Sequence, residues 1–563
     1  MSRIGNQPLL VLSDESQRTT GRDAQSMNIT AGKAVASAVR TTLGPKGMDK
    51  MLVDSGGNVV VTNDGVTILK EMDIEHPAAN MIVDVAETQE AEVGDGTTSA
   101  VVVAGELLSK AEDLLEQDIH PTTLVQGYRR AAHKATEILE ENAIDVDPED
   151  TEFLEQLAQT AMTGKGAEGS KEHLAQIVVQ AVQSVADEHG VDVDHIDIQD
   201  TVGGSIEDTE LIEGLVISKT PSHENMPLLL EDANIAVLNS PIEIPETEID
   251  AEVNVSDPDQ LQEFLDQEEA QLREMVDHLE ELGVDAVFTR KGIDDLAQHF
   301  LAEKGMMGVR RVRESQADQL CRATGATRVN DIFELSEDHL GYAGELVQRD
   351  VAGSDKLFVQ DVKDPKSVSI ILRGGTQHVV DEIERAIEDS IGVVRTVLDD
   401  GKVVPGGGAP EVTLSLALRD YADSVGGREQ LAVEAFADAV DVIPRTLAEN
   451  AGHDPIDSLV ELRSRHDGGE SDAGLEAYTG EVINMEDEGV LEPLRVKTQA
   501  IDAATESAVM ILRIDDVISA GDLAEDRDAG DDEDMPDMGG GMGGMGGGMG
   551  GMGGMGGGMG GMM

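Results

Sequence analysis

Apolar residues recur at intervals of three and four along most of the chain, a spacing that is typical of helices with one buried face. The strongest example covers 99–117, with apolar side chains at Val102, Val103, Leu107, Leu108, Ala111, Leu114 and Leu115. The same spacing predicts helices over 24–43 and 78–91. The first of these ends at Gly44-Pro45, as expected of residues that stop a helix. Much of the first quarter of the chain is therefore predicted to be helical.

A long helix is predicted after Pro258, because proline is favoured in the first helical turn. Its apolar stripe includes Leu261, Leu272 and Leu279, and its other face is dense in Asp and Glu. That pattern fits either a projecting arm or an ordinary surface helix. The pattern over 151–188 is also helical, interrupted at 163–166.

Strands are predicted mainly in the middle of the chain. The segments 51–53 and 59–61 flank turn residues and predict a β-hairpin, and 368–372 is a hairpin-like run that ends at Arg373-Gly374-Gly375. Further strands are predicted over 211–218, 235–238 and 286–288, and the proline-broken stretch PIEIPETEID is predicted to be extended. From Val379 the chain is predicted to be helical again, nearly to Asp516. Helical ends that enclose an α/β middle indicate a discontinuous base domain with an insertion.

The most informative motif is Gly94-Asp95-Gly96-Thr97-Thr98-Ser99, which lies between two predicted helices. A helix start offers free N–H groups and partial positive charge to an anion, and glycine allows close approach. Asp95 would repel phosphate, so beside phosphates it would hold Mg²⁺. The alternative is an ordinary glycine turn with a Thr/Ser helix cap. No Walker-type motif occurs in the sequence.

Three other turns could also face phosphates: LGPKG at 43–47, NDG at 63–65 and PGGG at 405–408. Asp64 lies at a switch from strand to helix, where it would face a ligand or serve only as an N-cap. Asp389 lies in a predicted helix whose apolar side includes Ile383, Ile387 and Ile391. By pattern alone, an aspartate on such a helix is solvated.

The chain of 563 residues has a formal net charge of −72, which excludes partners that are themselves polyanions, such as nucleic acid and anionic lipid. Such self-repulsion is screened at molar salt, where the Debye length is about 3 Å. We therefore expect a halophilic source with a salt-filled cytoplasm. Aromatic residues make up 2% of the chain, so stacking platforms for single-stranded nucleic acid are not expected.

The cysteine count and the termini add three expectations. Cys321 is the only cysteine, which rules out an intrachain disulfide and a four-thiolate metal site. Neither a signal peptide nor a membrane span is predicted, so a cytoplasmic location is expected. Residues 538–563 are only Gly and Met after an acidic run, which predicts a flexible tail that is either without a role or weakly adhesive toward apolar partners.

Five segments in order resemble the chaperonin family over nearly the whole chain: TTLGPKGMDKMLVD at 41–54, TNDGVTIL at 62–69, EVGDGTTS at 92–99, ERAIEDS at 384–390 and VPGGGAPE at 404–411. The chain looks closest to the archaeal group II branch, the thermosomes. TGKGAE at 163–168 is similar to the lysine turn of that branch, and SDPDQLQEFLDQEEAQLREMVDHL resembles its built-in lid. Asn63 stands where bacterial relatives carry Lys, while the Gly-Met tail is similar to bacterial members.

The resemblance implies a multi-domain chaperonin fold. A mostly α-helical equatorial ATPase domain would cover 1–147 and 402–526, and a small intermediate hinge domain 148–215 and 367–401. An α/β apical substrate-binding domain would cover 216–366, with a helical lid protrusion at about 243–280. A disordered acidic and Gly/Met tail would follow at 527–563.

The resemblance also implies roles for individual residues. Asp95 would bind Mg²⁺, Asp64 and Asp389 would orient and activate the attacking water, and Lys165 would sense the γ-phosphate. Glu492 replaces an Asp of bacterial relatives near the ribose. The remaining residues implied to bind ATP are Thr42, Leu43, Gly44, Pro45, Asn63, Gly94, Gly96, Thr97, Thr98, Ser99, Gly407, Gly408 and, near the base, Asn484 or Met485.

The implied function is ATP-dependent protein folding in a double ring of identical or sister subunits. Each ring would enclose unfolded or partly folded proteins, and Mg-ATP binding and hydrolysis would close the lid; K⁺ is a further possible cofactor. Two other functions stay open on the sequence: an ATP-binding ring scaffold without folding activity, and a small-molecule kinase that uses Asp389 as its base.

Overall fold

The computed structural model describes residues 18–148, 150–167, 169–187, 190–244, 258–362 and 367–518. Near the two ends of the chain, β1 (Arg18–Thr20) pairs with β19 (Asp516–Ile518) in a two-stranded sheet. Of the stretch 241–250, PIEIPETEID, predicted to be extended, residues 241–244 are described, and Ile242 forms a parallel bridge with Ile293. The rest of that stretch and the predicted Gly-Met tail lie outside the described residues. In the part that the structure describes, no helix is long and apolar enough to cross a membrane.

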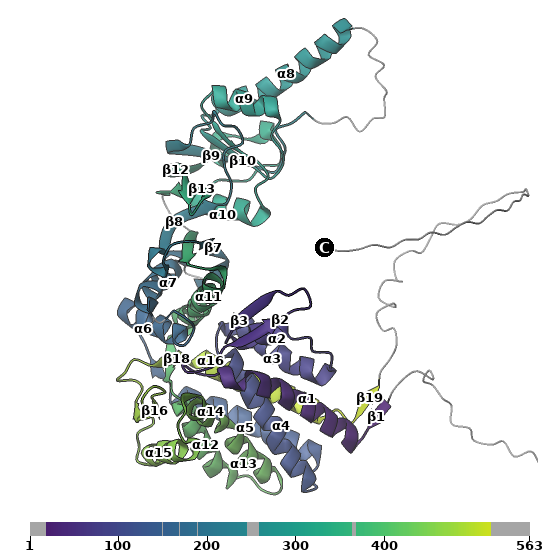
Figure 1. Ribbon diagram of the computed structural model, residues 1–563, viewed down its shortest axis with the longest axis vertical. Helices are drawn as coiled ribbons and strands as arrows, with labels where there is room; N and C mark the ends of the chain where they lie inside the picture. Colours follow the sequence, from purple (N-terminus) through teal and green to yellow (C-terminus); the bar gives the residue numbers. More distant parts are fainter. Residues whose placement is uncertain are drawn as a thin grey trace, which may run out of the picture. The chain divides into compact units, whose positions relative to one another are not determined.

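Helices dominate residues 18–141, as the periodicity predicts (Figure 1). The predicted hairpin is also present, since β2 (Lys50–Val53) pairs antiparallel with β3 (Val59–Thr62). The other elements of this region are α1 (Arg22–Val39), a 3₁₀ turn (Arg40–Thr42), α2 (Gly65–Glu71), α3 (Pro77–Val93), α4 (Thr97–Glu116) and α5 (Pro121–Glu141).

The last part of the chain joins these helices in one hydrophobic core. This last part of the chain contains β15 (Lys402–Pro405), α12 (Ala409–Ala422), α13 (Glu429–Val440), α14 (Val442–Ala451), α15 (Pro455–Asp467) and α16 (Leu494–Leu512). The prediction of helices nearly to Asp516 is wrong over 473–493. Three short strands lie there, β16 (Ala473–Leu475), β17 (Val482–Asn484) and β18 (Leu491–Pro493), because turn residues break the helical spacing.

Helix α4 lies at the centre of this core and packs against α1, α3, α13 and α16. Its residues Val101, Val102 and Val103 are consecutive and all buried, so α4 is covered on more than one face. Tyr128 of α5 donates a hydrogen bond from its hydroxyl to the Leu107 carbonyl at 2.8 Å, and its ring packs edge-on against Phe436. This buried packing holds the start of α4, and with it the GDGTTS turn, in place.

A second core is formed by two chain segments far apart in sequence. The first contains β4 (Ile144–Asp145), α6 (Thr151–Met162), α7 (Lys171–Val185), β5 (Ala186–Asp187), β6 (Gly190–Val191), the 3₁₀ turns Val193–His195 and Ile206–Asp208, and β7 (Ile196–Val202). The second contains β14 (Val368–Gly374) and α11 (Gln377–Asp400).

The middle of the chain is α/β, as predicted, and contributes six strands to an eight-stranded sheet of order β11-β10-β9-β12-β13-β8-β14-β7. These are β8 (Glu210–Ile217), β9 (Leu229–Leu238), β10 (Ala286–Thr289), β11 (Met307–Val309), β12 (Gly341–Val351) and β13 (Ser354–Gln360). The accompanying helices are α8 (Pro258–Glu281), α9 (Asp295–Glu303) and α10 (Glu314–Thr324), with 3₁₀ turns at Ile332–Glu334 and Glu337–His339. Two further cores lie on this sheet.

The hairpin-like interpretation of 368–372 is wrong. Strand β14 pairs parallel with β7 and antiparallel with β8, and all of Val368–Leu372 is buried. A short apolar run cannot distinguish a hairpin strand from a central strand, because its partners are set by distant parts of the chain. The glycine pair Gly374-Gly375 at the end of β14 leads into α11, which carries Asp389.

Candidate functional site

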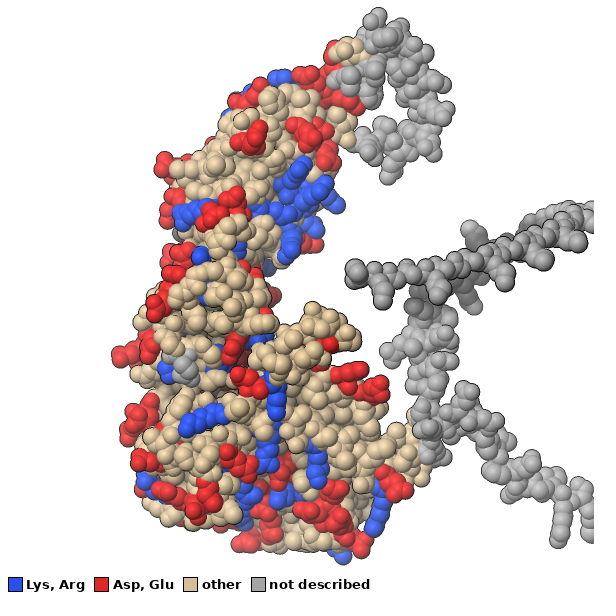
Figure 2. Space-filling model, in the orientation of Figure 1, with Lys and Arg blue, Asp and Glu red and all other residues tan. Residues whose placement is uncertain are grey.

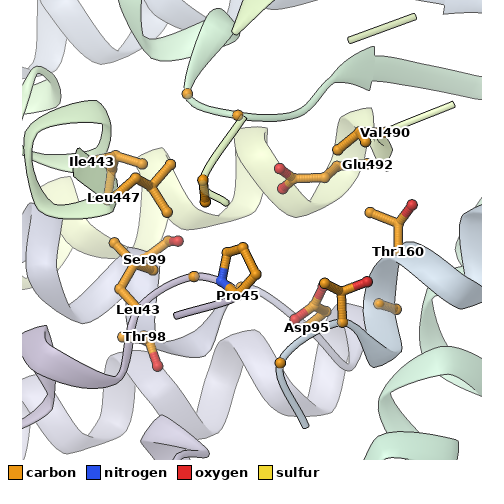
Figure 3. A pocket seen from close by; sticks show the side chains of 18 of the residues that line it. Leu43, Pro45, Asp95, Thr98, Ser99, Thr160, Ile443, Leu447, Val490 and Glu492 are labelled. Carbon is orange, nitrogen blue, oxygen red and sulfur yellow. The ribbon is translucent and has the colours of Figure 1, made fainter. Parts of the chain in front are cut away.

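A cavity of about 390 Å³ lies among the turns that the sequence singled out. Its lining comes from six separate stretches of the chain: the 3₁₀ turn after α1, the β3–α2 junction, the α3–α4 turn, the α6–α7 turn, α11, and the region from the end of β15 to the start of α16. Its size is within the range of small-molecule sites, about 300–1,000 Å³. Figure 3 shows Leu43, Ile443 and Leu447 on one side of the pocket, and Asp95, Thr160 and Glu492 on the other. The first side also carries the hydroxyl groups of Thr98 and Ser99, and the second side carries two carboxylates.

The GDGTTS turn joins α3 to α4 through two glycines in the left-handed conformation, Gly94 (φ 72°) and Gly96 (φ 79°). Gly96 is the N-cap of α4, and no side chain caps this end of the helix. The first N–H groups of α4 are thus available to an anion in the cavity. Gln89 fixes the turn from behind, since its amide nitrogen donates to the carbonyl oxygens of Asp95 (2.8 Å) and Val496 (3.1 Å).

Asp64 is the N-cap of α2, the role that the residue pattern alone favoured. One of its carboxylate oxygens accepts a hydrogen bond from the Thr67 N–H at 2.8 Å. Asp64 nevertheless lines the same cavity as Asp95. The side chain of neighbouring Asn63 donates to the Gly164 carbonyl at 2.6 Å, which ties the β3–α2 junction to the lysine turn.

Lys165 and Asp389 meet inside the cavity in a hydrogen-bonded ion pair, and the Lys165 Nζ lies 3.8 Å from Asp95 Oδ1. Asp389 is 6% exposed. Burial opposes the positive charge of Lys165, but Asp389 and Asp95 outweigh it and raise the pKa of the ammonium group. Burial raises the pKa of Asp389 to about 7, although Lys165 acts in the opposite direction. A single lysine thus neutralises part of a strongly acidic pocket.

Helix α11 approaches the GDGTTS turn so closely that only glycine fits on both sides. A Cβ at Gly392 would lie 2.9 Å from the Gly94 Cα, and a Cβ at Gly94 would lie 3.0 Å from the Gly392 Cα. This backbone contact places Asp389, one helical turn before Gly392, beside the GDGTTS turn.

The second wall of the cavity is built around the PGGG turn, where Gly407 (φ 64°) and Gly408 (φ 79°) lead into α12. A Cβ at Gly407 would lie 2.7 Å from the Met485 Cε and 2.9 Å from the Leu475 nitrogen, so a larger residue would displace this wall. Met485 itself is buried. The apolar residues of this wall suit a flat ring better than a phosphate group.

Glu492 lines the cavity and is ion-paired to Lys497 at 2.7 Å. Lys497 also lies 3.0 Å from Glu411 Oε1, so it is shared between two carboxylates. Burial raises the pKa of Glu492, while Lys497 opposes that shift. Glu492 is therefore held in position by a buried cation rather than free to turn.

The structure brings all but one of the predicted site residues to this cavity. The exception is Asn484, whose side-chain oxygen accepts hydrogen bonds from the N–H groups of Glu486 (2.9 Å) and Asp487 (3.1 Å) and so closes a local turn. Met485, the alternative proposed for the same position, does line the cavity.

Sequence reasoning missed Glu90, Thr160 and Lys497, which also line the cavity. Burial raises the pKa of Glu90 to about 8, reinforced by Asp389, and its Oε2 atom has no hydrogen-bond partner among the described residues. Glu90 lies on the last turn of α3, shortly before the turn that carries Asp95. Its place near the end of that predicted helix was the only signal in the sequence that it could face the site. Nothing in the local sequence distinguishes Thr160 or Lys497.

The described residues include no group of three or more His, Cys, Asp or Glu side chains arranged to hold a metal ion. Mg²⁺ at nucleotide sites does not need such a cage, because one or two carboxylates, water and phosphate oxygens complete its octahedron. Asp95 can supply such a carboxylate, since it lies on the GDGTTS turn and lines the cavity.

A mostly helical, multi-domain chain with a glycine-rich anion turn between two helices defines a nucleotide-binding class distinct from the P-loop proteins. The model of the TCP-1/cpn60 chaperonin family matches residues 35–522. The chain belongs to this family, whose members use ATP.

Relatives with curated names agree with this assignment. The chain is 68% identical over 538 residues to thermosome subunit 1 of Haloferax volcanii, covering 96% of this chain and 95% of the relative. It is 67% identical over 531 residues to thermosome subunit alpha of Halobacterium salinarum, covering 94% of each. It is 61% identical over 521 residues to the thermosome subunit of Methanopyrus kandleri, covering 92% of this chain and 96% of the relative.

Proposed function

We propose that the chain is a subunit of an ATP-dependent group II chaperonin that folds proteins and couples ATP hydrolysis to a closing movement. The observation that carries the proposal is the cavity in which the α4 N-terminus, Lys165 and Asp389 come together from three distant segments. Such a site can respond to a phosphate group by changing contacts between segments that belong to different hydrophobic cores.

The proposed domain boundaries follow those cores. The equatorial domain, 1–147 and 402–526, contains the helical core around α4. The intermediate hinge domain, 148–215 and 367–401, contains the core of α6, α7 and α11. The apical domain, 216–366, contains the cores on the rest of the sheet, and α8 begins within its proposed lid protrusion at 243–280.

Within the pocket, the proposed roles divide along its two walls. The N–H groups and hydroxyls of the α4 start would bind the β- and γ-phosphates, and Lys165 would contact the γ-phosphate. The apolar wall with Met485 would hold the base, and Glu492 would face the ribose hydroxyls. The other residues proposed to contact ATP are Thr42, Leu43, Gly44, Pro45, Asn63, Gly94, Gly96, Thr97, Thr98, Ser99, Gly407 and Gly408.

Charge balance supports a need for bound cations. Asp64, Glu90, Asp95 and Asp389 share the pocket with Lys165 alone on this side, and a triphosphate would add further negative charge. We propose Asp95 as the Mg²⁺ ligand; the metal, when bound, neutralises charge on the phosphate oxygens. K⁺ would suit the remaining carboxylate oxygens.

Asp64 and Asp389 are proposed to orient the attacking water and accept its proton. In the structure Asp389 is engaged by Lys165. A γ-phosphate that draws Lys165 toward itself would leave the carboxylate of Asp389 facing the water. Because Asp389 lies on α11 of the proposed hinge domain, its position relative to the phosphate would depend on hinge closure.

The proposed partners are unfolded or partly folded proteins and identical or sister subunits in stacked rings. The charge of −72 makes nucleic acid and anionic membranes poor partners. The self-repulsion of this charge is screened at high salt, which supports the proposal that the protein acts in a salt-rich cytoplasm.

One assay tests the function directly. A denatured client diluted into molar KCl should recover activity with the assembled protein and Mg-ATP, and recover little with Mg-ADP. Electron microscopy of the same sample should show double rings. Rings that bind ATP without improving recovery would indicate a scaffold, whereas a monomer that phosphorylates small hydroxyl compounds would indicate a kinase; either result contradicts the proposal.

A further inference from the structure

Positive side chains gather on one face of this acidic protein. The chain has 113 acidic and 41 basic residues, yet Figure 2 shows a cluster of Lys and Arg over the part that Figure 1 labels β10 and α10. We call Lys291, Arg310, Arg311 and Arg313 the basic patch. All four are exposed. A local excess of basic side chains is unexpected in a chain whose acidic residues far outnumber its basic residues.

The fold gathers the basic patch at one edge of the sheet. Strands β10 and β11 are parallel neighbours, so the residues that follow each strand emerge on the same side. The Arg311 N–H donates to the Lys291 carbonyl at 2.9 Å, and the Val312 N–H donates to the Thr289 carbonyl at 3.0 Å. Arg313 follows directly and is the N-cap residue of α10. The patch is therefore held by backbone hydrogen bonds.

The charge of the patch is not neutralised locally. Among the residues that the structure describes, Lys291, Arg311 and Arg313 have no ion-pair partner, and Arg310 has only a 3.9 Å contact with the highly exposed Asp295. The carboxylates on α10 are engaged by other cations. Glu314 pairs with Arg290 at 2.9 Å, and Asp318 pairs with Arg328 at 3.0 Å. These pairs occupy the two carboxylates of α10 and reduce their competition for the patch.

Arg311 has a further peculiarity, because its backbone is in the left-handed region with φ at 54°. Glycine is the residue that adopts this conformation without strain, and a side chain there is disfavoured by its Cβ. A strained backbone that keeps a long charged side chain is the kind of outlier that points to function.

We propose that the basic patch binds carboxylate-rich segments of client proteins. The inference rests on the proposed chaperone function and names a substrate class for it. Guanidinium groups pair with carboxylates through two parallel hydrogen bonds, a geometry that Lys does not reproduce. At molar salt the screening length is about 3 Å, so only direct contacts of this kind persist. Arg311 and Arg313 offer such contacts to an acidic chain segment, and Lys291 adds a third positive charge beside them.

Charge complementarity favours an acidic polypeptide over nucleic acid. The net charge of −72 repels a long polyanion outside the patch, and binding to phosphates weakens steeply as salt increases. The basic patch contains no aromatic side chain on which a base could stack. A short acidic segment of a client, by contrast, needs only the patch itself.

The test uses the full-length assembled protein without nucleotide in molar KCl. A labelled peptide rich in Glu is compared with the same peptide in which every Glu is Gln, by fluorescence anisotropy. We expect the acidic peptide to bind at least about tenfold more tightly than the amide peptide. The charge-reversed variant Lys291→Glu/Arg311→Glu/Arg313→Glu should lose that preference, and the variant Lys291→Arg, which keeps the charge and both unpaired arginines, should retain it.

Two controls keep the result interpretable. Basal ATP hydrolysis should be unchanged in every variant, because none of the altered residues lines the nucleotide cavity. If the triple variant fails to fold, Arg311→Gly removes one charge while relieving the backbone strain, and should still reduce the preference for the acidic peptide.

Equal binding of the two peptides, or tighter binding of a single-stranded DNA of similar length, would overturn the inference. Failure of the broader function gives a different result. A protein that prefers the acidic peptide but restores no client to activity would refute the chaperone function and leave the patch assignment standing. A protein that refolds clients but binds the two peptides equally would refute the patch assignment and leave the chaperone function standing.

Discussion

Lys165 and Asp389 are separated by 224 residues in the sequence and form an ion pair in the cavity beside the GDGTTS turn. The same Lys165 Nζ lies 3.8 Å from Asp95 Oδ1. One cation is thus shared between the proposed metal ligand and the proposed base. A phosphate that contacts Lys165 would compete directly with Asp389, which connects nucleotide occupancy to the freedom of a carboxylate on α11.

Replacing Asp389 with Asn should abolish most ATP hydrolysis while leaving ATP binding nearly intact. Asn keeps the shape of the side chain but cannot accept a proton from water, and loss of a general base reduces rates by about 100- to 10,000-fold. Phosphate release at saturating ATP measures the rate, and equilibrium titration with labelled ATP measures the affinity.

Glu388→Gln is the matched control, because Glu388 precedes Asp389 on α11 but is exposed. It should hydrolyse ATP at nearly the normal rate. Unimpaired hydrolysis by Asp389→Asn would remove that residue from the proposed mechanism.

Asp95→Asn should weaken nucleotide binding in the presence of magnesium. The proposed metal contact would be lost, and we expect affinity for ATP to fall by about tenfold or more, equivalent to at least about 1.4 kcal/mol. Calorimetric titrations with MgCl₂ and with EDTA separate the metal-dependent part. Asp113→Asn on the exposed face of α4, the helix that follows the turn, is the control. Equal affinities of Asp95→Asn and the unaltered protein in MgCl₂ would refute the assignment.

The sequence was sufficient to predict the helices that carry the site. Their apolar residues follow a regular period, and the GDGTTS turn lies between two such stripes, as α3 and α4 do in the structure. Turn residues likewise predicted the β2–β3 hairpin. These features depend on neighbours in sequence, which a single chain reveals.

Features that depend on distant contacts could not be predicted in the same way. Asp389 has the pattern of a surface aspartate, and it is buried because Gly392 lets α11 reach Gly94. Glu90 and Lys497 carry no local signal, since their surroundings come from other segments. Strand β14 was misread for the same reason, because its partners β7 and β8 are contributed from elsewhere in the chain.

Lys497→Met should strongly destabilise the protein. Lys497 is 7% exposed and neutralises the buried Glu411 and the half-buried Glu492, so removing it would leave two carboxylates without a cation. Breaking a buried pair in this way reduces the free energy of unfolding by about 3–5 kcal/mol. Thermal unfolding at fixed KCl without nucleotide measures the effect.

The double variant Lys497→Met/Glu411→Gln tests the cause, because it removes one of the two uncompensated charges. It should recover part of the lost stability relative to Lys497→Met. A double variant that is less stable than the single variant would show that packing around Lys497, and not charge, dominates.

Gly392→Ala should slow ATP hydrolysis by displacing α11 from the GDGTTS turn. The new methyl group would lie 2.9 Å from the Gly94 Cα and 3.0 Å from the Val93 carbonyl oxygen, so backbone would have to move. Overpacking of this kind costs about 1–3 kcal/mol. Gly426→Ala is a control, since a Cβ there meets nothing within 4 Å. Normal hydrolysis and stability in Gly392→Ala would show that this contact is not needed to position Asp389.

Glu384 should make the stability of the protein depend on pH. Burial, reinforced by Glu388, raises the pKa of Glu384 from 4.5 to about 7. A carboxyl group whose pKa is raised on folding contributes stability that is fully present below pH 4.5 and is lost as the pH rises through 7. Because Glu384 is partly exposed, solvent screening reduces the expected loss to about 1 kcal/mol.

Glu384→Gln removes this titration, so the variant should gain stability relative to the unaltered protein as the pH increases. The difference in the free energy of unfolding should be near zero at about pH 4, grow between about pH 5 and 7, and stay constant above that range. Denaturant titrations at constant KCl measure it, with the exposed Glu116→Gln on α4 as the control. A difference that does not change with pH would mean that Glu384 ionises as readily in the folded chain as in the unfolded one, and that the neighbouring carboxylates on α11 do not affect it.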